Sequence, residues 1–384
     1  MNQETMLGWY DKLERLVSKL PGPLQKAILS ELQPVKELFL EQRPARILLT
    51  GTSEVSRMEI VNSLFREQVI ALNDERHLPI APGWEKFERV AGGSVLLLDA
   101  RGQNSLHWGS GREFFAPDIV LFASQHQTSQ EDVKRASEGL VQALVEIEAK
   151  FEQRPPVFGV VEGAAAGEVS GRTAAAQMDA TLRSHPLISR ALVQVHSIAR
   201  WSRFRPDGTP DELLESGLQE LLTGIVDEFP TQAKLEMARI SGVRAAQKKI
   251  AQTLIKATAA VSAAIGAQPI PLADMPILTA LQSSMAAGII YISGGELNVK
   301  SGLKFLGSLG ATIGLGIVLR ETARSAAKLV PGFGYAVSGA VAAAGTMAIG
   351  RAATAFFIDG MSLQETKKIF RRKQKNDTQG SLKS

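Results

Sequence analysis

Between residues 45 and 197 the hydrophobic positions fall into short continuous runs separated by polar stretches. The run ARILLTG, apolar from Ile47 to Leu49 and ending at Gly51, is typical of a strand whose two faces are both covered. Further apolar runs lie at 94–99, 118–124, 156–162 and 191–197. Because these runs alternate with helix-patterned stretches, the sequence predicts a mainly parallel sheet with helices on both faces.

A β-hairpin is predicted within residues 84–99. The segments 84–90 and 94–99 are both β-like, and Gly92-Gly93 between them is a pair that tight hairpin turns favour. This hairpin would add one antiparallel strand to the sheet.

Apolar residues at intervals of three and four predict amphipathic helices in the polar stretches. These helices lie at 7–20, 24–39, 131–151 and 211–229. Pro21-Gly22-Pro23 would end the first of them. We expect the two N-terminal helices to pack on the domain that follows them. The alternative is that they bind a partner or form a dimer.

From residue 231 onward the pattern changes to long uncharged blocks rich in alanine and glycine. The blocks lie at 257–273, 275–295, 305–319 and 330–350. Pro269 and Pro271 must interrupt any helix, whereas Asp274 can cap the next one and Pro276 is tolerated in its first turn. The sequence therefore predicts an all-α apolar region behind the sheet.

Two interpretations of this apolar region stay open. The blocks approach the roughly 20 residues that cross a bilayer, so the helices could lie in or insert into a membrane. Their low leucine and isoleucine content also suits a soluble bundle of tightly packed small-residue helices. Gly310 and Gly314 have the spacing of a small-residue pair for close helix contact in either case.

Composition narrows the classes of function. The 384 residues suffice for two or three domains, and the absence of cysteine excludes disulfides, thiolate zinc sites and cysteine nucleophiles. The five histidines show no metal-ligand spacing. A net charge of +4, with much of the basicity flanking the apolar region, does not favour nucleic acid as a partner. The absence of cysteine also fits a reducing cytosolic compartment, and the N-terminus lacks the basic-then-apolar order of a signal peptide.

The segment 45–65 has the order strand, glycine, polar loop and helix, which is the layout of a phosphate-binding P-loop. The pattern G-x-x-x-x-G-K-[ST] aligns with its first glycine at Gly51. Its last three positions then hold Ser56, Arg57 and Met58. Arg57 keeps the charge of the usual lysine, but a methionine thioether is unsuited to magnesium. We therefore expect a nucleotide-binding shape with altered phosphate-binding chemistry.

The segment LLLDARG at 96–102 extends this pattern, and with it the chain resembles the Era-like branch of small P-loop GTPases. Asp99 and Gly102 match the family's Asp-x-x-Gly, in which the aspartate meets magnesium through water and the glycine amide meets the γ-phosphate. The resemblance implies an α/β fold of P-loop GTPase type. The candidate nucleotide-site residues are Gly51, Ser56, Arg57, Asp99 and Gly102.

Other parts of the family's apparatus are missing. No threonine lies between Thr52 and Thr128 to act as the switch ligand of magnesium, and Glu162-Gly163-Ala164-Ala165 replaces the guanine-reading Asn-Lys-x-Asp. Efficient GTP hydrolysis is not expected, because metal and positive charge carry most phosphoryl-transfer catalysis. No catalytic residue, metal ligand or cofactor is predicted. GTP is kept open as a ligand of an unconventional nucleotide-binding switch, the alternative to a pseudo-GTPase scaffold or adaptor.

The apolar region carries a second resemblance. The runs PIPLADMPILTALQSSM at 269–285 and LVPGFGYAVSGAVAAAGTMAIGRAA at 329–353 resemble the YcjF-like family of bacterial domains of unknown function. Members of that family often follow an Era-like GTPase domain and are commonly regarded as membrane-associated. The resemblance implies an anionic membrane surface or bilayer as a partner, on the cytoplasmic face of the membrane; the cytoplasm is the alternative location. A protein partner is expected without being identified, and an oligomer is left open.

The predicted organisation has four parts. Amphipathic helices occupy 1–43, the GTPase-like domain occupies 44–230, and the apolar helical domain occupies 231–366. A basic, partly disordered tail follows at 367–384, beginning KKIFRRKQK.

Overall fold

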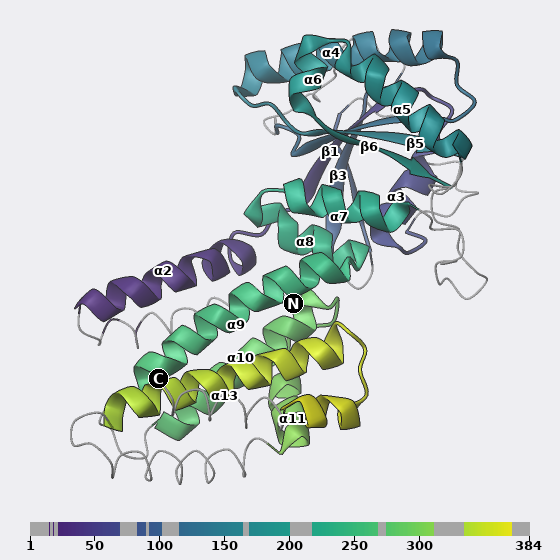
Figure 1. The fold of residues 1–384 in the computed structure, drawn as a ribbon. Helices are drawn as coiled ribbons and strands as arrows, with labels where there is room; N and C mark the ends of the chain where they lie inside the picture. Colours follow the sequence, from purple (N-terminus) through teal and green to yellow (C-terminus); the bar gives the residue numbers. More distant parts are fainter. Residues whose placement is uncertain are drawn as a thin grey trace. The chain divides into compact units, whose positions relative to one another are not determined.

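The computed structural model describes residues 15, 18, 22–69, 83–89, 92–101, 115–163, 169–199, 217–267, 274–310 and 334–370. The chain forms two compact units. One is the sheet unit, Arg43–Val243, and the other is the helical unit, which joins Met1–Gln42 to Arg244–Ser384 (Figure 1). The sheet unit is thus inserted, along the sequence, into the helical unit.

Among the described residues, the sheet unit contains a six-stranded sheet in the order β2-β3-β1-β4-β5-β6. The strands are β1 Ala45–Gly51, β2 Glu85–Glu88, β3 Ser94–Asp99, β4 Ile119–Gln125, β5 Val157–Glu162 and β6 Leu192–Ile198. Strand β2 runs antiparallel to β3, and all the other neighbours are parallel. These pairings confirm the predicted mainly parallel sheet and the predicted hairpin.

Helices cover both faces of this sheet (Figure 1). Helices α4 Gln130–Phe151, α5 Val169–Arg183 and α6 Pro186–Ala191 share one buried apolar cluster with Leu48, Val120 and Phe122. Helices α3 Arg57–Phe65, α7 Leu218–Glu228 and α8 Thr231–Ser241 lie on the other face. Because side chains alternate between two covered faces, β1 is apolar at consecutive positions.

Helix α8 belongs to the sheet unit, whereas the sequence placed the start of the apolar domain at residue 231. One reason is a contact with the hairpin: the Glu236 carboxylate accepts a hydrogen bond from the Ser94 backbone N–H at 2.9 Å. Within α8 the same carboxylate forms an ion pair with Arg239 at 3.2 Å. An amphipathic pattern predicts that α8 buries one face, but it does not say against which neighbour.

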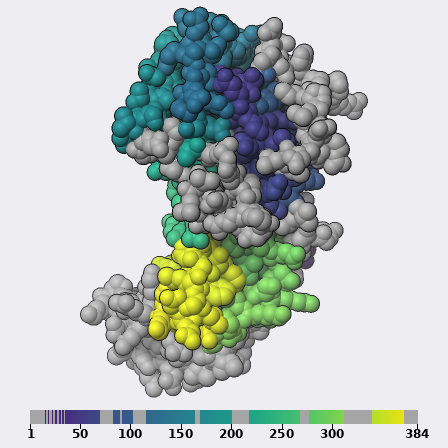
Figure 2. Space-filling model, turned by 90° about the vertical axis from the view of Figure 1, so that its right-hand side faces the viewer, coloured from purple at the N-terminus to yellow at the C-terminus, as the bar shows by residue number. Residues whose placement is uncertain are grey.

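The helical unit contains α2 Gly22–Phe39, α9 Arg244–Gly266, α10 Asp274–Ile292, α11 Val299–Leu309 and α13 Gly334–Phe357. In Figure 2 the segment 334–370 (yellow) lies against the segment 274–310 (green). Small residues allow the helices to approach closely: a Cβ added at Gly302 would lie 2.0 Å from the Ser283 carbonyl oxygen of α10. This helical region, most of which follows the sheet unit in the sequence, confirms the predicted fold class.

Three features predicted from the sequence lie partly or wholly outside the described residues. Gly310 is the C-cap of α11, with a left-handed φ of 72°, and its N–H bonds the carbonyls of Leu306 and Gly307. Gly310 therefore ends α11. Gly314 lies outside the described residues, so the small-residue pair that it would form with Gly310 stays a prediction. The N-terminal helix predicted at 7–20 and the basic tail beyond residue 370 also lie almost entirely outside them.

One helix in the described part of the chain is long and apolar enough to cross a membrane. Its window, Gly339–Phe357, has a mean hydropathy of 1.3, and 50% of it is buried inside the structure. Core helices of soluble proteins meet the same criterion, so this helix alone does not decide between a spanning segment and a bundle core.

Candidate functional site

The loop between β1 and α3 leaves the sheet at Gly51. This residue has φ 107°, and a Cβ built on it would lie 2.1 Å from the carbonyl oxygen of Ala123 in β4. No other residue type fits this combination of a positive φ and a close backbone approach. The next N–H, that of Thr52, donates to the same Ala123 oxygen at 2.9 Å. Gly51 thus fixes the place where the loop turns away from the sheet.

Ser56 is the N-cap of α3. Its Oγ accepts a hydrogen bond from the Glu59 backbone N–H at 3.4 Å. Glu59, in the first turn, carries negative charge to the end of the helix where anionic ligands bind in P-loop proteins. The predicted nucleotide-site residue Ser56 therefore has a capping role.

Arg57 contacts the hairpin edge of the sheet. Its Nη1 lies 2.7 Å from Oε2 of Glu85 in β2, and the side chains of Arg57 and Glu85 are 10% and 29% exposed. The cation that takes the place of the P-loop lysine is thus ion-paired within the protein. This partner lies 28 residues away along the chain, and sequence pattern offers no signal for it.

Asp99, at the end of β3, forms a buried bidentate ion pair with Arg101. Nε of Arg101 donates to Oδ1 at 2.9 Å and Nη2 donates to Oδ2 at 2.7 Å. The two side chains are only 1% and 6% exposed. The remaining guanidinium nitrogen, Nη1, donates to the carbonyl oxygen of Val55 in the β1–α3 loop. Bidentate pairs of this kind are among the stronger polar interactions in proteins.

A magnesium-nucleotide does not fit this donor set. Both oxygens of the Asp99 carboxylate accept hydrogen bonds from Arg101, so the cation beside this carboxylate is a guanidinium of the chain itself. The position that supplies a hydroxyl ligand in P-loop proteins is Met58. Within the described residues, no group of three or more histidine, aspartate and glutamate side chains is arranged to hold a metal ion.

The outer part of the β1–α3 loop is tied to the end of β4. Oε2 of Glu54 accepts a hydrogen bond from the Thr128 hydroxyl at 2.6 Å, and its backbone carbonyl accepts one from Gln125 Nε2 at 3.2 Å. The Gln125 N–H in turn donates to Thr128 Oγ1 at 3.2 Å. These hydrogen bonds fix the Glu54 carboxylate in the β1–α3 loop next to the end of β4.

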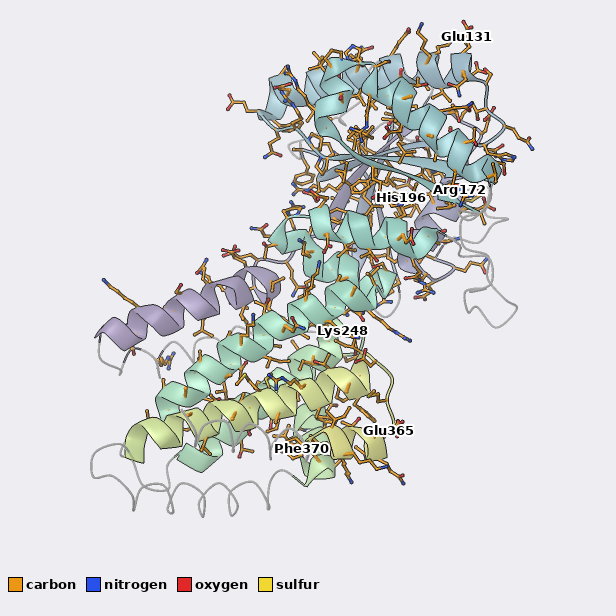
Figure 3. The ribbon with its side chains drawn as sticks, in the orientation of Figure 1. Glu131, Arg172, His196, Lys248, Glu365 and Phe370 are labelled. Atoms are coloured by element: carbon orange, nitrogen blue, oxygen red, sulfur yellow. The ribbon has the colours of Figure 1, made fainter. Side chains whose placement is uncertain are left out.

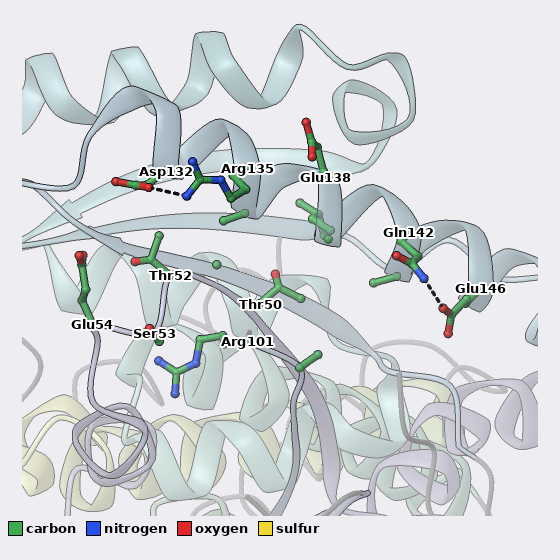
Figure 4. A pocket seen from close by; sticks show the side chains of 16 residues that line it. Thr50, Thr52, Ser53, Glu54, Arg101, Asp132, Arg135, Glu138, Gln142 and Glu146 are labelled. Carbon is green, nitrogen blue, oxygen red and sulfur yellow. Dashed lines mark hydrogen bonds and ion pairs between the residues drawn. The ribbon is translucent and has the colours of Figure 1, made fainter. Parts of the chain in front are cut away.

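A cavity of about 540 Å³ opens between this loop and helix α4 (Figure 4). Its walls are the loop Thr50–Glu54, the residues after β3 and one face of α4. The lining residues are Thr50, Gly51, Thr52, Ser53, Glu54, Ala100, Arg101, Asp132, Arg135, Ala136, Glu138, Gly139, Leu140, Gln142, Ala143 and Glu146.

Four of the predicted nucleotide-site residues lie along β1, β3 and the N-terminus of α3, while Gly102 lies outside the described residues. The described four are Gly51, Ser56, Arg57 and Asp99. Nucleotide binding by these residues stays a prediction. Sequence reasoning missed Arg101, although its place two residues after Asp99 at a strand end was a usable signal. It also missed the α4 face of the cavity, because that face acquires its neighbours only through the fold.

No protein-family model matches the chain, and no curated protein matches it. Among solved structures, one from work on dimerisation and GTPase activity of the chloroplast translocon components atToc33 and psToc159 is similar at 14% identity and a TM-score of 0.32. The match covers 55% of this chain and 92% of that one.

Two structures of an oligomerised bacterial dynamin pair, described as sensing and tethering membranes, are also similar. The first has 10% identity and a TM-score of 0.34, and covers 99% of this chain and 72% of that one. The second has 12% identity and a TM-score of 0.32, and the match covers 97% of this chain and 77% of that one. Identities and TM-scores at this level assign the chain to none of these families.

Proposed function

We propose that the sheet unit is a GTPase-like scaffold that does not turn over GTP and serves as an adaptor joined to the helical unit. The observation that supports this is the buried ion pair between Asp99 and Arg101. In P-loop GTPases an aspartate helps to hold magnesium, and the metal neutralises the charge that develops during phosphoryl transfer. Here the corresponding carboxylate is neutralised by an arginine instead.

The cost of opening this pair is the physical basis of the proposal. Freeing Asp99 for a metal ion would leave the Arg101 guanidinium buried without its carboxylate, and breaking a buried pair costs about 3–5 kcal/mol. A loss of that size weakens an affinity by roughly 10²–10⁴-fold. Magnesium-nucleotide would have to overcome this penalty without a hydroxyl ligand at Met58.

The test is a calorimetric titration of the full-length protein with GTP, with and without magnesium, followed by a hydrolysis assay. The proposal expects no saturable magnesium-dependent binding at micromolar GTP and no turnover. Magnesium-dependent binding in the low micromolar range accompanied by hydrolysis would overturn it.

An unconventional nucleotide-binding switch is the second candidate, and the position of Arg57 favours it. A cation in the first turn of α3 lies where backbone N–H groups attract phosphate. In that case binding would be independent of magnesium, and Arg57→Ala would weaken it. The matched variant Glu85→Gln removes the carboxylate that pairs with Arg57 and would strengthen it. If neither variant changes nucleotide affinity, the switch is excluded.

We also propose that the helical unit associates with an anionic membrane surface on its cytoplasmic face; residence in the cytoplasm is the alternative. The supporting observation is the apolar window Gly339–Phe357 of α13. Cell fractionation followed by salt, carbonate and detergent extraction tests this. Electrostatic attachment should be lost at high salt, whereas inserted helices should require detergent. Recovery of all the protein in the soluble fraction at low salt would rule out membrane association.

A further inference from the structure

We infer that the cavity between the β1–α3 loop and α4 is a groove that docks an extended basic segment of a partner protein. The groove lies entirely within the sheet unit, and its volume of about 540 Å³ suits a few residues of a peptide. This inference adds a binding site to the proposed adaptor, and it holds whether or not the protein binds nucleotide.

Gly139 is the first observation that points to a ligand. It lies in the middle of α4, where glycine destabilises a helix by about 1 kcal/mol relative to alanine. The residue is exposed, and a Cβ added to it would meet no atom of the protein within 4 Å. Packing within the fold therefore does not explain the missing side chain. Close approach of another chain to the α4 backbone would explain it.

Other residues that line the groove also have small side chains. Ala136, Gly139 and Ala143 occupy neighbouring turns on one side of α4, and Ala100 lines the groove from the end of β3.

The lining of the groove carries an excess of negative charge, which favours a basic ligand. Both lining arginines are ion-paired with aspartates: Arg101 with Asp99, and Arg135 with Asp132 at 3.1 Å. Three further carboxylates come from both walls of the groove, and among the lining residues no lysine or arginine balances them (Figure 4). They belong to Glu54, Glu138 and Glu146. An anionic ligand is repelled there, whereas lysine and arginine side chains are attracted.

The length of the acidic wall favours a peptide over a single small cation. The lining residues of α4 run from Asp132 to Glu146, and at about 1.5 Å per residue this wall is roughly 20 Å long. An extended segment of about six residues spans that distance. Such a segment would present alternate basic side chains to the carboxylates.

Fluorescence anisotropy with the full-length protein tests the inference. The probe is a labelled peptide of about eight residues that alternates lysine or arginine with alanine, and its counterpart carries glutamate in place of the basic residues, at roughly 0.15 M salt. The Gly139→Leu variant adds a large side chain at a position where a Cβ meets no atom of the fold within 4 Å, and Glu138→Lys reverses one lining charge. Glu131→Lys makes the same charge change on the same helix, outside the lining (Figure 3).

We expect the wild-type protein to bind the basic peptide and not the acidic one. Gly139→Leu and Glu138→Lys should each weaken binding about tenfold or more, while Glu131→Lys should leave it within about twofold. Gly139→Leu should melt no lower than the wild type, which separates lost binding from lost folding. Equal binding by all variants would overturn the inference, as would equal losses for Glu131→Lys and Glu138→Lys with none for Gly139→Leu. Because no nucleotide is present, the result is independent of the GTP titration.

Discussion

His196 is a buried ionisable residue of β6 in the core of the sheet unit, and its ring lies near Gly224 of α7. It is 6% exposed, its ring stacks 6.5 Å from that of Phe158, and its Nε2 has no hydrogen-bond partner among the described residues (Figure 3). Burial lowers the pKa of this imidazole below its usual 6.5, and the charge of Glu220 opposes the shift only in part. The folded protein therefore holds His196 neutral.

This shift makes the stability of the protein depend on pH. Between the lowered pKa of the folded state and about 6.5, the unfolded chain binds a proton that the folded chain does not, so stability falls as the pH drops through this window. Urea unfolding at about pH 7.5 and about pH 5.5 measures the loss. His196→Gln should be less stable at the higher pH but should lose less on acidification. An unchanged loss in the variant would show that another group is responsible.

The pair of Asp99 and Arg101 gives a second prediction at this scale. Arg101→Ala leaves the Asp99 carboxylate buried without its guanidinium, and we expect the free energy of unfolding to fall by about 3–5 kcal/mol. Adding Asp99→Ala removes the carboxylate that has lost Arg101 and should restore part of that loss. Denaturant unfolding of the two single variants and the double variant measures the coupling. Strictly additive losses would mean that the pair acts as two independent residues.

Individual elements differ in how far the sequence predicts them. Strands β4, β5 and β6 begin and end within one residue of the predicted apolar runs. In β4 and β5 nearly every residue is buried, because both faces of the sheet are covered there, and the apolar run therefore marks the strand directly. The neighbours of α8 and the end of α11 at Gly310 were not predicted. Both depend on tertiary contacts or on backbone conformation, which hydrophobic periodicity does not encode.

The residues of the candidate site likewise divide into those that the sequence predicts and those that only the fold brings together. Gly51 is predictable because a local backbone constraint requires glycine at a strand end. The partner of Arg57 is not predictable, because Glu85 reaches it only when the hairpin pairs with the sheet. Gly139 could be recognised only as an unfavourable residue in a predicted helix; its place in a groove comes from the fold.

A buried polar cluster connects three helices of the helical unit. The Thr346 hydroxyl of α13, fully buried, donates to Ser262 Oγ of α9 at 2.9 Å and accepts from Gln282 Nε2 of α10 at 3.0 Å. In a bundle whose other contacts are between small apolar side chains, such hydrogen bonds fix which faces of the helices meet.

Thr346→Val tests this cluster with little change of shape. It removes the hydrogen bonds to Gln282, which is half-buried, and to Ser262, whose hydroxyl keeps its bond to the Thr258 carbonyl. We therefore expect a loss of about 1–2 kcal/mol in the free energy of unfolding. Thr354 on the same helix donates only to the carbonyl of Gly350 among the hydrogen bonds described, so Thr354→Val should cost less, roughly 0.5 kcal/mol. Equal losses for both variants in chemical denaturation would contradict a bundle-specifying role for Thr346.

At the scale of the whole molecule, the helical unit is assembled from both ends of the sequence. Its N-terminal part, α2, buries Leu32, Val35 and Phe39. The Phe39 ring lies 6.3 Å from that of Tyr291 in α10, and the Tyr291 hydroxyl donates to Gln42 Oε1 at 3.1 Å. The sequence predicted instead that the N-terminal helices pack on the domain directly following them.

A chain that begins at residue 43 tests this assembly. It retains the whole sheet unit but loses α2, and with it the burial of three large apolar side chains at about 1.5–3 kcal/mol each. Scanning calorimetry should show a lower melting temperature for the helical unit and little change for the sheet unit, because the two have separate cores. The variant Phe39→Ala should produce a smaller shift of the same transition. A shortened chain in which only the sheet transition moves would mean that α2 belongs energetically to the sheet unit.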